Sequence, residues 1–340
     1  MTAAAAAGAV TVVMPTHNRS RLMQDTLRSV LAQVEVDLRV VVVDDGSSDD
    51  TPAVLGAISS LGVQWCRHDQ ARGVSNARNT GLAMVETPWV AFVDDDDLWS
   101  PDKLVAQLSS LQESRGARWS CTGSVVTDSS LAILRHERPP PVTDLSAHVL
   151  KNNCIPAGGS GVLAAADLVR QVGGFDPAYS NLADWDLWIR LALKSRATSV
   201  ARPLVAYRVQ ASGMAHGVQR TTDELDAIIE KYAEERDARG VSIDWGTWYR
   251  YFARLHLRQG DQRAAAREYF RAARHGRWTR VGVGALCFVV PGLTSWADRR
   301  SRWRLPRAWR HEAEEWLAPL RKAPPLVADP APAIELARRP

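Results

Sequence analysis

Short apolar segments alternate with amphipathic ones over the first third of the chain. Val10–Met14, Leu38–Val43 and Val63–Cys66 are β-branched or otherwise apolar runs of the kind that form buried strands. The segments after them space their apolar residues as one face of a helix does, over residues 22–31, 51–61 and about 74–85. Buried strands that alternate with helices predict an α/β fold with a mostly parallel sheet and helices on both of its faces.

A fourth apolar run, Trp89–Val93, leads directly into four carboxylates, Asp94–Asp97. The pattern predicts a buried strand with acids at its carboxyl end. Ser100 and Pro101 then predict the cap and first residue of a helix, with residues 102–103 on its exposed face. Adjacent carboxylates repel one another, and a hard divalent cation such as Mg²⁺ or Mn²⁺ would compensate them. The alternative is a solvated acidic turn.

Ligands of parallel α/β sheets bind outside the carboxyl ends of the strands. Three polar clusters fall at such ends: residues 15–19, Asp44–Asp45 and the four acids. The first turn between strand and helix has no glycine, and GxxxxGK[ST] is absent, so neither common glycine-rich phosphate loop is present. The sequence therefore predicts that a bound nucleotide is held through a metal ion and arginines, with Arg72 and Arg78 as candidates.

Beyond residue 118 the pattern is less regular. We expect a strand over residues 118–127, a proline-rich loop over 138–143, a glycine-rich bend over 153–161, a helix over 165–172 and a closing strand over 202–210. The bend either contacts substrate through Gly159 and Ser160 or is only a turn. On a helix that includes residues 183–188, Trp185 and Trp188 are three residues apart and can wall an apolar pocket.

The C-terminal third predicts helices over residues 221–239, with a capping box of Thr221 and Glu224, and over 247–259 and 262–275. Residues 276–322 hold ten Lys/Arg against four Asp/Glu, although the whole chain has a net charge of only +4. Within residues 281–310, an apolar stretch is followed by Trp and Arg. This composition suits either contact with the surface of an anionic membrane or a helix packed on its own domain. Residues 323–340 are rich in Ala and Pro, and we expect them to be disordered.

Composition restricts the class of protein. The hydrophobic fraction of 46% and charged fraction of 24% are those of a soluble globular protein. Four scattered cysteines without a CxxC pair suggest neither a zinc site nor a disulfide framework, and they favour a cytoplasmic setting, either free or peripheral on the cytoplasmic face of a membrane. We expect no signal peptide, no membrane span and no nucleic-acid partner, whereas a homo-oligomer stays open.

Five blocks follow one another along the chain: MPTHNR, VVVDDGSSDDT, RGVSNARNTGL, FVDDDDLW and ADWDLWIRL. Their order and spacing resemble the family 2 glycosyltransferases, inverting enzymes of the Rossmann-like GT-A fold that use nucleotide sugars. The resemblance covers roughly residues 9–215. It implies a catalytic domain over residues 1–217, with a nucleotide-sugar half (about 9–118) and an acceptor half (about 119–217), and then a helical region over 218–322.

The resemblance implies a site for a nucleoside diphosphate sugar, with a UDP- or dTDP-sugar favoured. Thr16 and Asp45 would hold the nucleoside, although Asp44–Ser47 also fits an ordinary turn. The DxD motif of the family falls on residues 94–96. Asp96 would be the main ligand of Mn²⁺ or Mg²⁺, with Asp94 beside it. The donor-binding set is Pro15, Thr16, Asn18, Arg19, Asp44, Asp45, Arg72, Arg78, Asp94 and Asp95.

The resemblance also implies a general base, at Asp184, with Asp186 as the fallback. The alternative is that Asp184 only caps a helix whose tryptophans belong to the core. Ala183 stands where the family commonly has Glu, which removes an acidic neighbour of the base. The acceptor, a hydroxyl-bearing glycan, lipid-linked or small molecule, would contact Gly159, Ser160, Trp185 and Asp186. Where the family often has a His, this chain has Gln210, and we expect His216 in a solvent-facing loop.

Two other functions compete with glycosyl transfer. A phosphoryl-transfer enzyme would use Asp94 and Asp96 as nucleophile and acid, but no Thr follows the pair as it does in dehalogenase-like phosphatases. A membrane-associated scaffold would keep the fold without activity, and the joint presence of Asp45, Asp96 and Asp184 argues against it.

Overall fold

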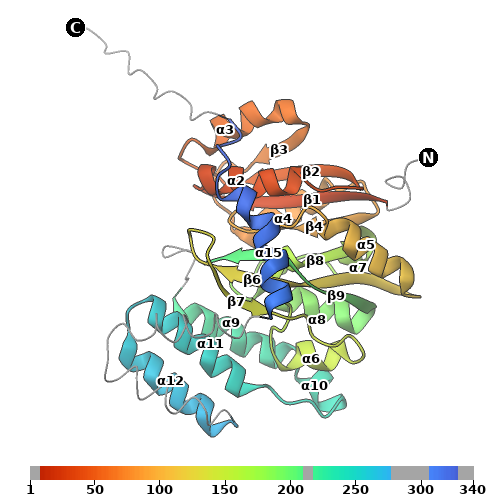
Figure 1. The fold of residues 1–340 in the computed structure, drawn as a ribbon. Coiled ribbons are helices and arrows are strands. Elements are labelled where there is room, and N and C mark those ends of the chain that lie inside the picture. Colours follow the sequence, from red (N-terminus) through yellow and green to blue (C-terminus); the bar gives the residue numbers. More distant parts are fainter. Residues whose placement is uncertain (1–7, 210–216, 277–305, 328–340) are drawn as a thin grey trace.

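The computed structural model describes residues 8–209, 217–276 and 306–327. One nine-stranded sheet runs through the molecule in the order β3-β2-β1-β4-β8-β6-β9-β5, with β7 paired to β6 (Figure 1). The strands are β1 Ala9–Thr16, β2 Asp37–Asp44, β3 Val63–Arg67, β4 Trp89–Phe92, β5 Leu98–Trp99, β6 Ala117–Thr127, β7 Ile133–Glu137, β8 Val162–Ala165 and β9 Arg196–Arg208.

The sheet is mostly parallel, as predicted. Strands β1 to β4 are parallel to one another, β8 reverses the direction, and β6 and β9 return to it. The antiparallel members are β5, β7 and β8. Strands β5, β7 and β8 were not predicted from the sequence, because they are short and closely follow or precede turns. Because β1, β2 and β4 are parallel neighbours, the polar clusters after these strands meet at one edge of the sheet.

Helices cover both faces of the sheet (Figure 1). On β1, Val12 and Met14 join one core cluster and Val13 joins the other, the alternation expected of a strand buried on both sides. The helices are α2 Ser20–Leu31, α3 Thr51–Ile58, α4 Val74–Ala83, α5 Lys103–Glu113, α6 Leu145–Lys151, α7 Ala166–Gln171, α8 Ala183–Lys194, α9 Val218–Lys231, α10 Ala233–Ala238, α11 Trp245–Arg258, α12 Gln262–Arg274 and α15 Arg307–Leu320.

Two predicted helix starts are wrong. Helix α5 begins at Lys103 with Asp102 as its N-cap, so Ser100 is not the cap; its hydroxyl bonds to Asp102 instead. Lys103, expected on the exposed face, is fully buried, with its ammonium 3.8 Å from the centre of the Trp99 ring. Helix α9 begins at Val218, so residues 221–224 lie inside it and form no capping box.

The C-terminal region is helical, as predicted, where the structure describes it. The membrane-contact prediction for residues 281–310 falls almost entirely outside the described residues. No helix among the described residues is long and apolar enough to cross a membrane. The predicted disordered tail is wrong for its first residues, because Leu326 and Val327 pack on the core cluster beside α2 and the Val327 N–H bonds to Gln24 Oε1 at 3.0 Å.

Candidate functional site

Four carboxylates follow β4, and arginines and a hydroxyl from other elements contact three of them. The guanidinium of Arg78, on α4, pairs with Asp94. The Thr16 hydroxyl, at the end of β1, donates to Asp95 Oδ2 at 2.8 Å. Arg19 Nη1 bridges Asp95 Oδ1 at 3.0 Å and Asp96 Oδ2 at 2.9 Å. Residues predicted from three separate motifs therefore meet at one edge of the sheet.

Asp97 belongs to the interior rather than to the open cluster. It is fully buried and accepts hydrogen bonds from the Ser160 hydroxyl at 2.6 Å and the Arg208 backbone N–H at 3.1 Å. Burial and the charges of Asp96 and Asp94 raise its pKa well above the usual value. Ser160 also accepts from the Asp94 N–H at 3.0 Å, so the glycine-rich bend is attached directly to the acidic turn.

Asp94 and Asp96 fit a divalent cation. Their side chains are 31% and 16% exposed, whereas that of Asp95 is 8% exposed and fully engaged. Burial, and then the charges of Asp95 and Asp94, raise the pKa of Asp96 to about 7, a repulsion that a cation would relieve. The described residues hold no cluster of three or more metal-ligating side chains. Mg²⁺ and Mn²⁺ commonly bind through one or two carboxylates and share the rest of their coordination with substrate phosphates and water, which two open carboxylates allow.

The acids after β2 organise the neighbouring loop. Asp45 Oδ1 accepts the backbone N–H of Arg72 and Oδ2 accepts that of Gly73, both at 2.8 Å. His68 Nδ1 lies 2.7 Å from Asp45 Oδ1. Burial alone would raise the pKa of Asp45, but these hydrogen bonds, first that of Arg72, hold it below the usual value. Asp44 accepts the Ser47 N–H at 2.9 Å. Asp44 and Asp45 therefore fix the shape of the loops that follow β2 and β3. The side chain of Arg72 is exposed.

The loop after β1 docks onto the same turn. Asn18 has a left-handed backbone, with φ of 54°, and its side-chain oxygen accepts the N–H groups of Ser48 at 2.7 Å and Asp49 at 3.3 Å. Pro15 lies within β1, in register with Val43 of β2. The predicted donor-binding residues from the first two strands thus form one connected wall.

Asp184 lies in the first turn of α8. Asn153 donates to Asp184 Oδ2 at 3.2 Å, and the Trp185 N–H donates to Oδ1 at 2.7 Å. Burial raises the pKa of Asp184; the charge of Arg78 opposes this shift and that of Asp94 adds to it. Asp184 and Asp94 are therefore electrostatic neighbours, which brings the predicted base and the predicted metal ligand into one site.

Two glycines, Gly158 and Gly159, adjoin Asp184, Arg78 and Asp94 and leave room for these side chains. A Cβ on Gly158 would lie 2.9 Å from Asp184 Oδ2, and a Cβ on Gly159 would lie 3.3 Å from Arg78 Nη2 and 3.7 Å from Asp94 Oδ1. The bend predicted over residues 153–161 thus lies between the base and the acids, and only its lack of side chains lets them come so close.

Trp185 and Asp186 do not face this site. Trp185 is fully buried, and its indole N–H donates to the Val149 carbonyl at 2.6 Å. Asp186 is fully buried and engages Arg190, Lys231 Nζ at 2.7 Å and the Tyr232 hydroxyl at 2.7 Å. Both carboxylate oxygens of Asp186 therefore already have partners inside the protein, which leaves no exposed oxygen for an acceptor. The tryptophans are core, as the alternative interpretation had it, whereas Asp184 remains at the cluster.

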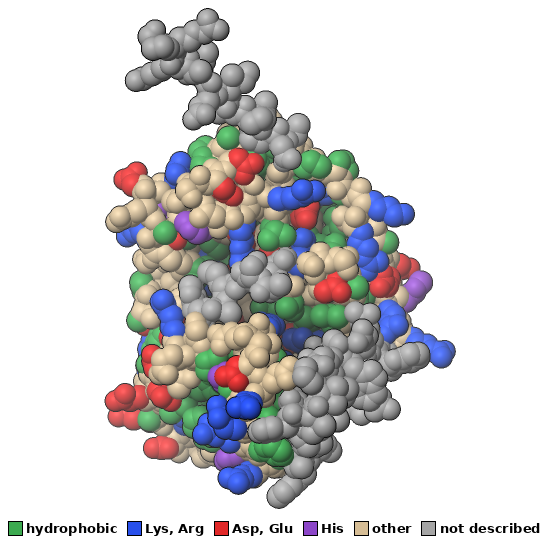
Figure 2. Space-filling model, turned by 90° about the vertical axis from the view of Figure 1, so that its left-hand side faces the viewer, with side chains coloured by type: hydrophobic (Ala, Val, Ile, Leu, Met, Phe, Trp, Pro, Cys, Tyr) green, Lys and Arg blue, Asp and Glu red, His purple; other side chains and the backbone are tan. Residues whose placement is uncertain are grey.

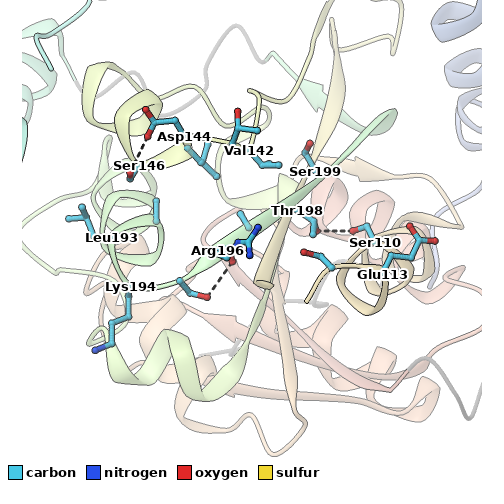
Figure 3. A pocket seen from close by; sticks show the side chains of 16 residues that line it. Ser110, Glu113, Val142, Asp144, Ser146, Leu193, Lys194, Arg196, Thr198 and Ser199 are labelled. Carbon is cyan, nitrogen blue, oxygen red and sulfur yellow. Dashed lines mark hydrogen bonds between the residues drawn. The ribbon is translucent and has the colours of Figure 1, made fainter. Parts of the chain in front are cut away.

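A polar groove elsewhere carries none of the predicted site residues. It is lined by the end of α5, the loop before α6 and the α8–β9 junction, with Ser110 and Thr198 hydrogen-bonded at 2.8 Å (Figure 3). It lies at the end of α8 opposite to Asp184. His216 falls outside the described residues. Three residues of the site were not predicted from the sequence, although all three lie within segments whose structure was predicted: Asn153, Gly158 and Arg208.

Comparisons with known proteins agree with the resemblance to the family 2 glycosyltransferases. Residues 11–154 match the family model described as Glycosyl transferase family 2. The chain is 23% identical over 227 residues to UDP-Glc:alpha-D-GlcNAc-diphosphoundecaprenol beta-1,3-glucosyltransferase WfgD of Escherichia coli, covering 65% of this chain and 87% of the relative.

Solved structures have the same fold at low sequence identity. The structure of S. aureus TarS 1-349 in complex with UDP has a TM-score of 0.53 and 16% identity, over 78% of this chain and 72% of that chain. The mannosyltransferase PcManGT from Pyrobaculum calidifontis, in complex with GDP-Man and Mn2+, has a TM-score of 0.50 and 18% identity, over 92% and 85% of the two chains.

Proposed function

Because this chain belongs to the family 2 glycosyltransferases, we propose that it is a metal-dependent, inverting enzyme that moves a sugar from a nucleoside diphosphate to an acceptor hydroxyl. The observation that carries the proposal is that the Arg78 guanidinium pairs with Asp94 and also opposes the rise in the pKa of Asp184, while the bend at Gly158 and Gly159 adjoins both acids. A base and a diphosphate-binding acid must flank the sugar in such a reaction, one on the acceptor side and one on the leaving-group side.

The nucleoside lies along the wall formed by the ends of β1 and β2. Asp45 shapes this wall by holding the N–H groups of Arg72 and Gly73, and Thr16 connects it to Asp95. Arg78, buried beside the acids, and Arg72, exposed at the rim, supply positive charge toward the diphosphate. UDP- and dTDP-sugars are the favoured donors.

Asp96 and Asp94 would hold Mn²⁺ or Mg²⁺. When bound, the ion would neutralise the charge that develops on the departing diphosphate. Arg19, which bridges Asp95 and Asp96, keeps these carboxylates together and adds a second positive charge on the leaving-group side.

Asp184 accepts the proton of the acceptor hydroxyl as that oxygen attacks the anomeric carbon. Its raised pKa makes it a better base than an ordinary aspartate. Asn153 and the Trp185 N–H orient the two carboxylate oxygens. The acceptor is a glycan or lipid-linked molecule; the name of the Escherichia coli relative, which includes a diphosphoundecaprenol-linked sugar, supports the lipid-linked choice.

Thermal stabilisation by nucleotides tests the donor site. The wild-type protein is heated with UDP, dTDP or GDP, each with and without Mn²⁺. We expect a shift that requires both one nucleotide and the metal, and we expect Asp96→Asn to lose the metal-dependent part. Asp167→Asn, a change at a carboxylate 75% exposed on α7, is the matched control. No shift with any pair would contradict the proposal.

A further inference from the structure

Helices α11 and α12 form a hairpin that is attached to the helix carrying the proposed base. The rings of Trp248, on α11, and Trp185, on α8, lie 4.8 Å apart, and Trp185 follows Asp184 directly in the chain. Trp248 also belongs to the core cluster that contains α8. A small core joins α12 to α11: Ala253, Ala266 and Tyr269. The hairpin is therefore fixed on the acceptor side of the proposed site.

Four exposed arginines occupy one face of α12: Arg263, Arg267, Arg271 and Arg274. At 3.6 residues per turn they fall within an arc of about 80°, and they extend over roughly 16 Å of the helix axis. The opposite side of the helix is buried: Ala265, Ala266, Tyr269, Ala272 and Ala273. The buried side fixes the orientation of the helix, so all four arginines face outward. We call these four residues the α12 arginine face.

Acidic residues do not offset the charge of this face. Glu268 is the one acid in α12, and it is buried and pairs with Arg271 at 2.9 Å. Asp261, in the turn before α12, caps the helix by accepting the Ala264 N–H at 2.9 Å. Residues 245–275 hold seven Arg and only these two acids, a net charge of +5, whereas the whole chain carries +4. An ordinary solvated helix face mixes charges of both signs, so the hairpin is a distinctly basic element.

Partly exposed aromatic rings adjoin the α12 arginine face. Trp245 and Tyr249, at the start of α11, stack with their ring centres 5.6 Å apart. The Tyr249 ring also lies 5.4 Å from that of His275 and 5.9 Å from the guanidinium carbon of Arg271. Figure 2 shows Lys and Arg side chains beside hydrophobic ones near the lower end of this side of the molecule, the side on which α11 and α12 lie in Figure 1. Trp and Tyr rings beside basic residues suit the boundary between water and lipid.

We propose that the α12 arginine face, with Trp245 and Tyr249, is a docking surface for an anionic membrane. The guanidinium fork matches the phosphate oxygens of lipid headgroups, and basic residues near an anionic leaflet add to binding one by one. The chain continues from α12 into residues 276–322, which hold ten Lys/Arg against four Asp/Glu. The positive charge of the chain is therefore concentrated in the hairpin and the sequence directly after it.

The choice of a membrane over another polyanion rests on the proposed function, in which the acceptor is lipid-linked. A lipid-linked sugar stays at the surface of the leaflet that holds its lipid. Because the hairpin packs on α8 beside Asp184, docking through the hairpin would bring the base to that surface. The donor wall at the ends of β1 and β2 belongs to other elements, and it stays open to a nucleotide sugar from solution.

Binding to lipid vesicles tests the inference. The full chain, without nucleotide or metal, is sedimented with vesicles of phosphatidylcholine alone or of equal parts of phosphatidylcholine and phosphatidylglycerol. We expect binding to the anionic vesicles to be at least about tenfold tighter, and we expect high salt to remove this preference. Arg263→Gln/Arg267→Gln should weaken binding to the anionic vesicles by about tenfold or more, because each basic residue contributes roughly fivefold. Both positions are exposed, so folding should be unaffected.

Arg39→Gln/Arg115→Gln is the matched control, because it removes the same charge from exposed positions in β2 and in the loop after α5. It should bind the anionic vesicles as the wild type does. Equal binding of the two kinds of vesicle by the wild type, or equal losses in the two double variants, would overturn the inference. Tighter binding of a single-stranded RNA than of the anionic vesicles would also overturn it and assign the face to nucleic acid. Thermal stabilisation by UDP and Mn²⁺ is measured separately, so failure of the docking surface and failure of the proposed donor site are distinguishable.

Discussion

Asp94 and Asp184 act on the same guanidinium group, although one follows a central strand and the other lies at the start of α8. Arg78 pairs with Asp94, and its charge lowers the pKa of Asp184 against the effect of burial. A positive charge near two carboxylates offsets the repulsion between them. In the proposed reaction, Asp94 would serve the leaving-group side of the sugar and Asp184 the side from which the acceptor attacks.

Replacing the base should stop turnover without removing donor binding. We expect Asp184→Asn to lower kcat by roughly 10²- to 10⁴-fold, because the amide cannot accept the hydroxyl proton. Metal-dependent stabilisation by the nucleotide should persist, since Asp96 and Thr16 are untouched. Initial rates of sugar transfer, measured beside thermal shifts, check both parts. Turnover equal to that of the wild type would refute the assignment of the base.

The hydrogen bond from Asn153 should set the pH at which the base is active. It stabilises the charged form of Asp184. Asn153→Ala removes it, so the pKa of Asp184 rises and more of the base is protonated at a given pH. The acidic limb of kcat/KM should then move upward by about one pH unit. Asn152→Ala, at a neighbouring position whose side chain makes no hydrogen bond to Asp184, should leave the limb in place. A limb that does not move in Asn153→Ala would exclude this role.

A methyl group in the glycine bend should displace the base. Gly158 has a φ of +48°, and a Cβ there would meet Asp184 Oδ2 at 2.9 Å. Gly173 also has a positive φ, of +91°, but no atom lies within 4 Å of its added Cβ. Alanine at either position should cost about 1–2 kcal/mol of stability through backbone strain. Only Gly158→Ala should also lower kcat, by about a hundredfold. Comparable kcat losses in the two variants would show that strain alone is responsible.

The donor side was predictable because its residues follow strands whose pairing is simple. Thr16 and Asp95 come from β1 and β4, parallel neighbours in which Val13 is in register with Phe92. Local motifs at the ends of adjacent parallel strands must meet, so the sequence predicted the cluster without any knowledge of tertiary contacts.

The base side was harder to predict because distant segments build it. Asn153 reaches Asp184 only because the antiparallel strand β8, whose short apolar run has no distinct period, directs the glycine bend toward α8. Lys103 was expected to be exposed, as lysines usually are. It is buried because Trp99 and the Gln107 side chain, 2.8 Å from its ammonium, surround it. Neither contact is visible in the helical pattern alone.

Glu224 stabilises the start of α8, although the sequence predicted that it caps its own helix. Glu224 does not cap its own helix; its carboxylate accepts the N–H groups of Ser180, Asn181 and Leu182, each at 2.9 Å, just before the helix that carries Asp184. Glu224→Gln replaces one acceptor oxygen by a donor that faces these N–H groups. We expect a loss of about 1–3 kcal/mol of stability, measured by denaturant unfolding, since buried donors are left without an acceptor.

The same change should lower kcat more than it raises the KM for the donor, because it loosens the base and leaves the nucleotide wall intact. Glu230→Gln, at an exposed position of α9, removes the same charge and should alter neither quantity. Glu224→Asp keeps the carboxylate and should recover part of kcat. If Glu224→Gln destabilised the protein with kcat unchanged at a temperature where it is folded, Glu224 would hold the fold together without positioning Asp184.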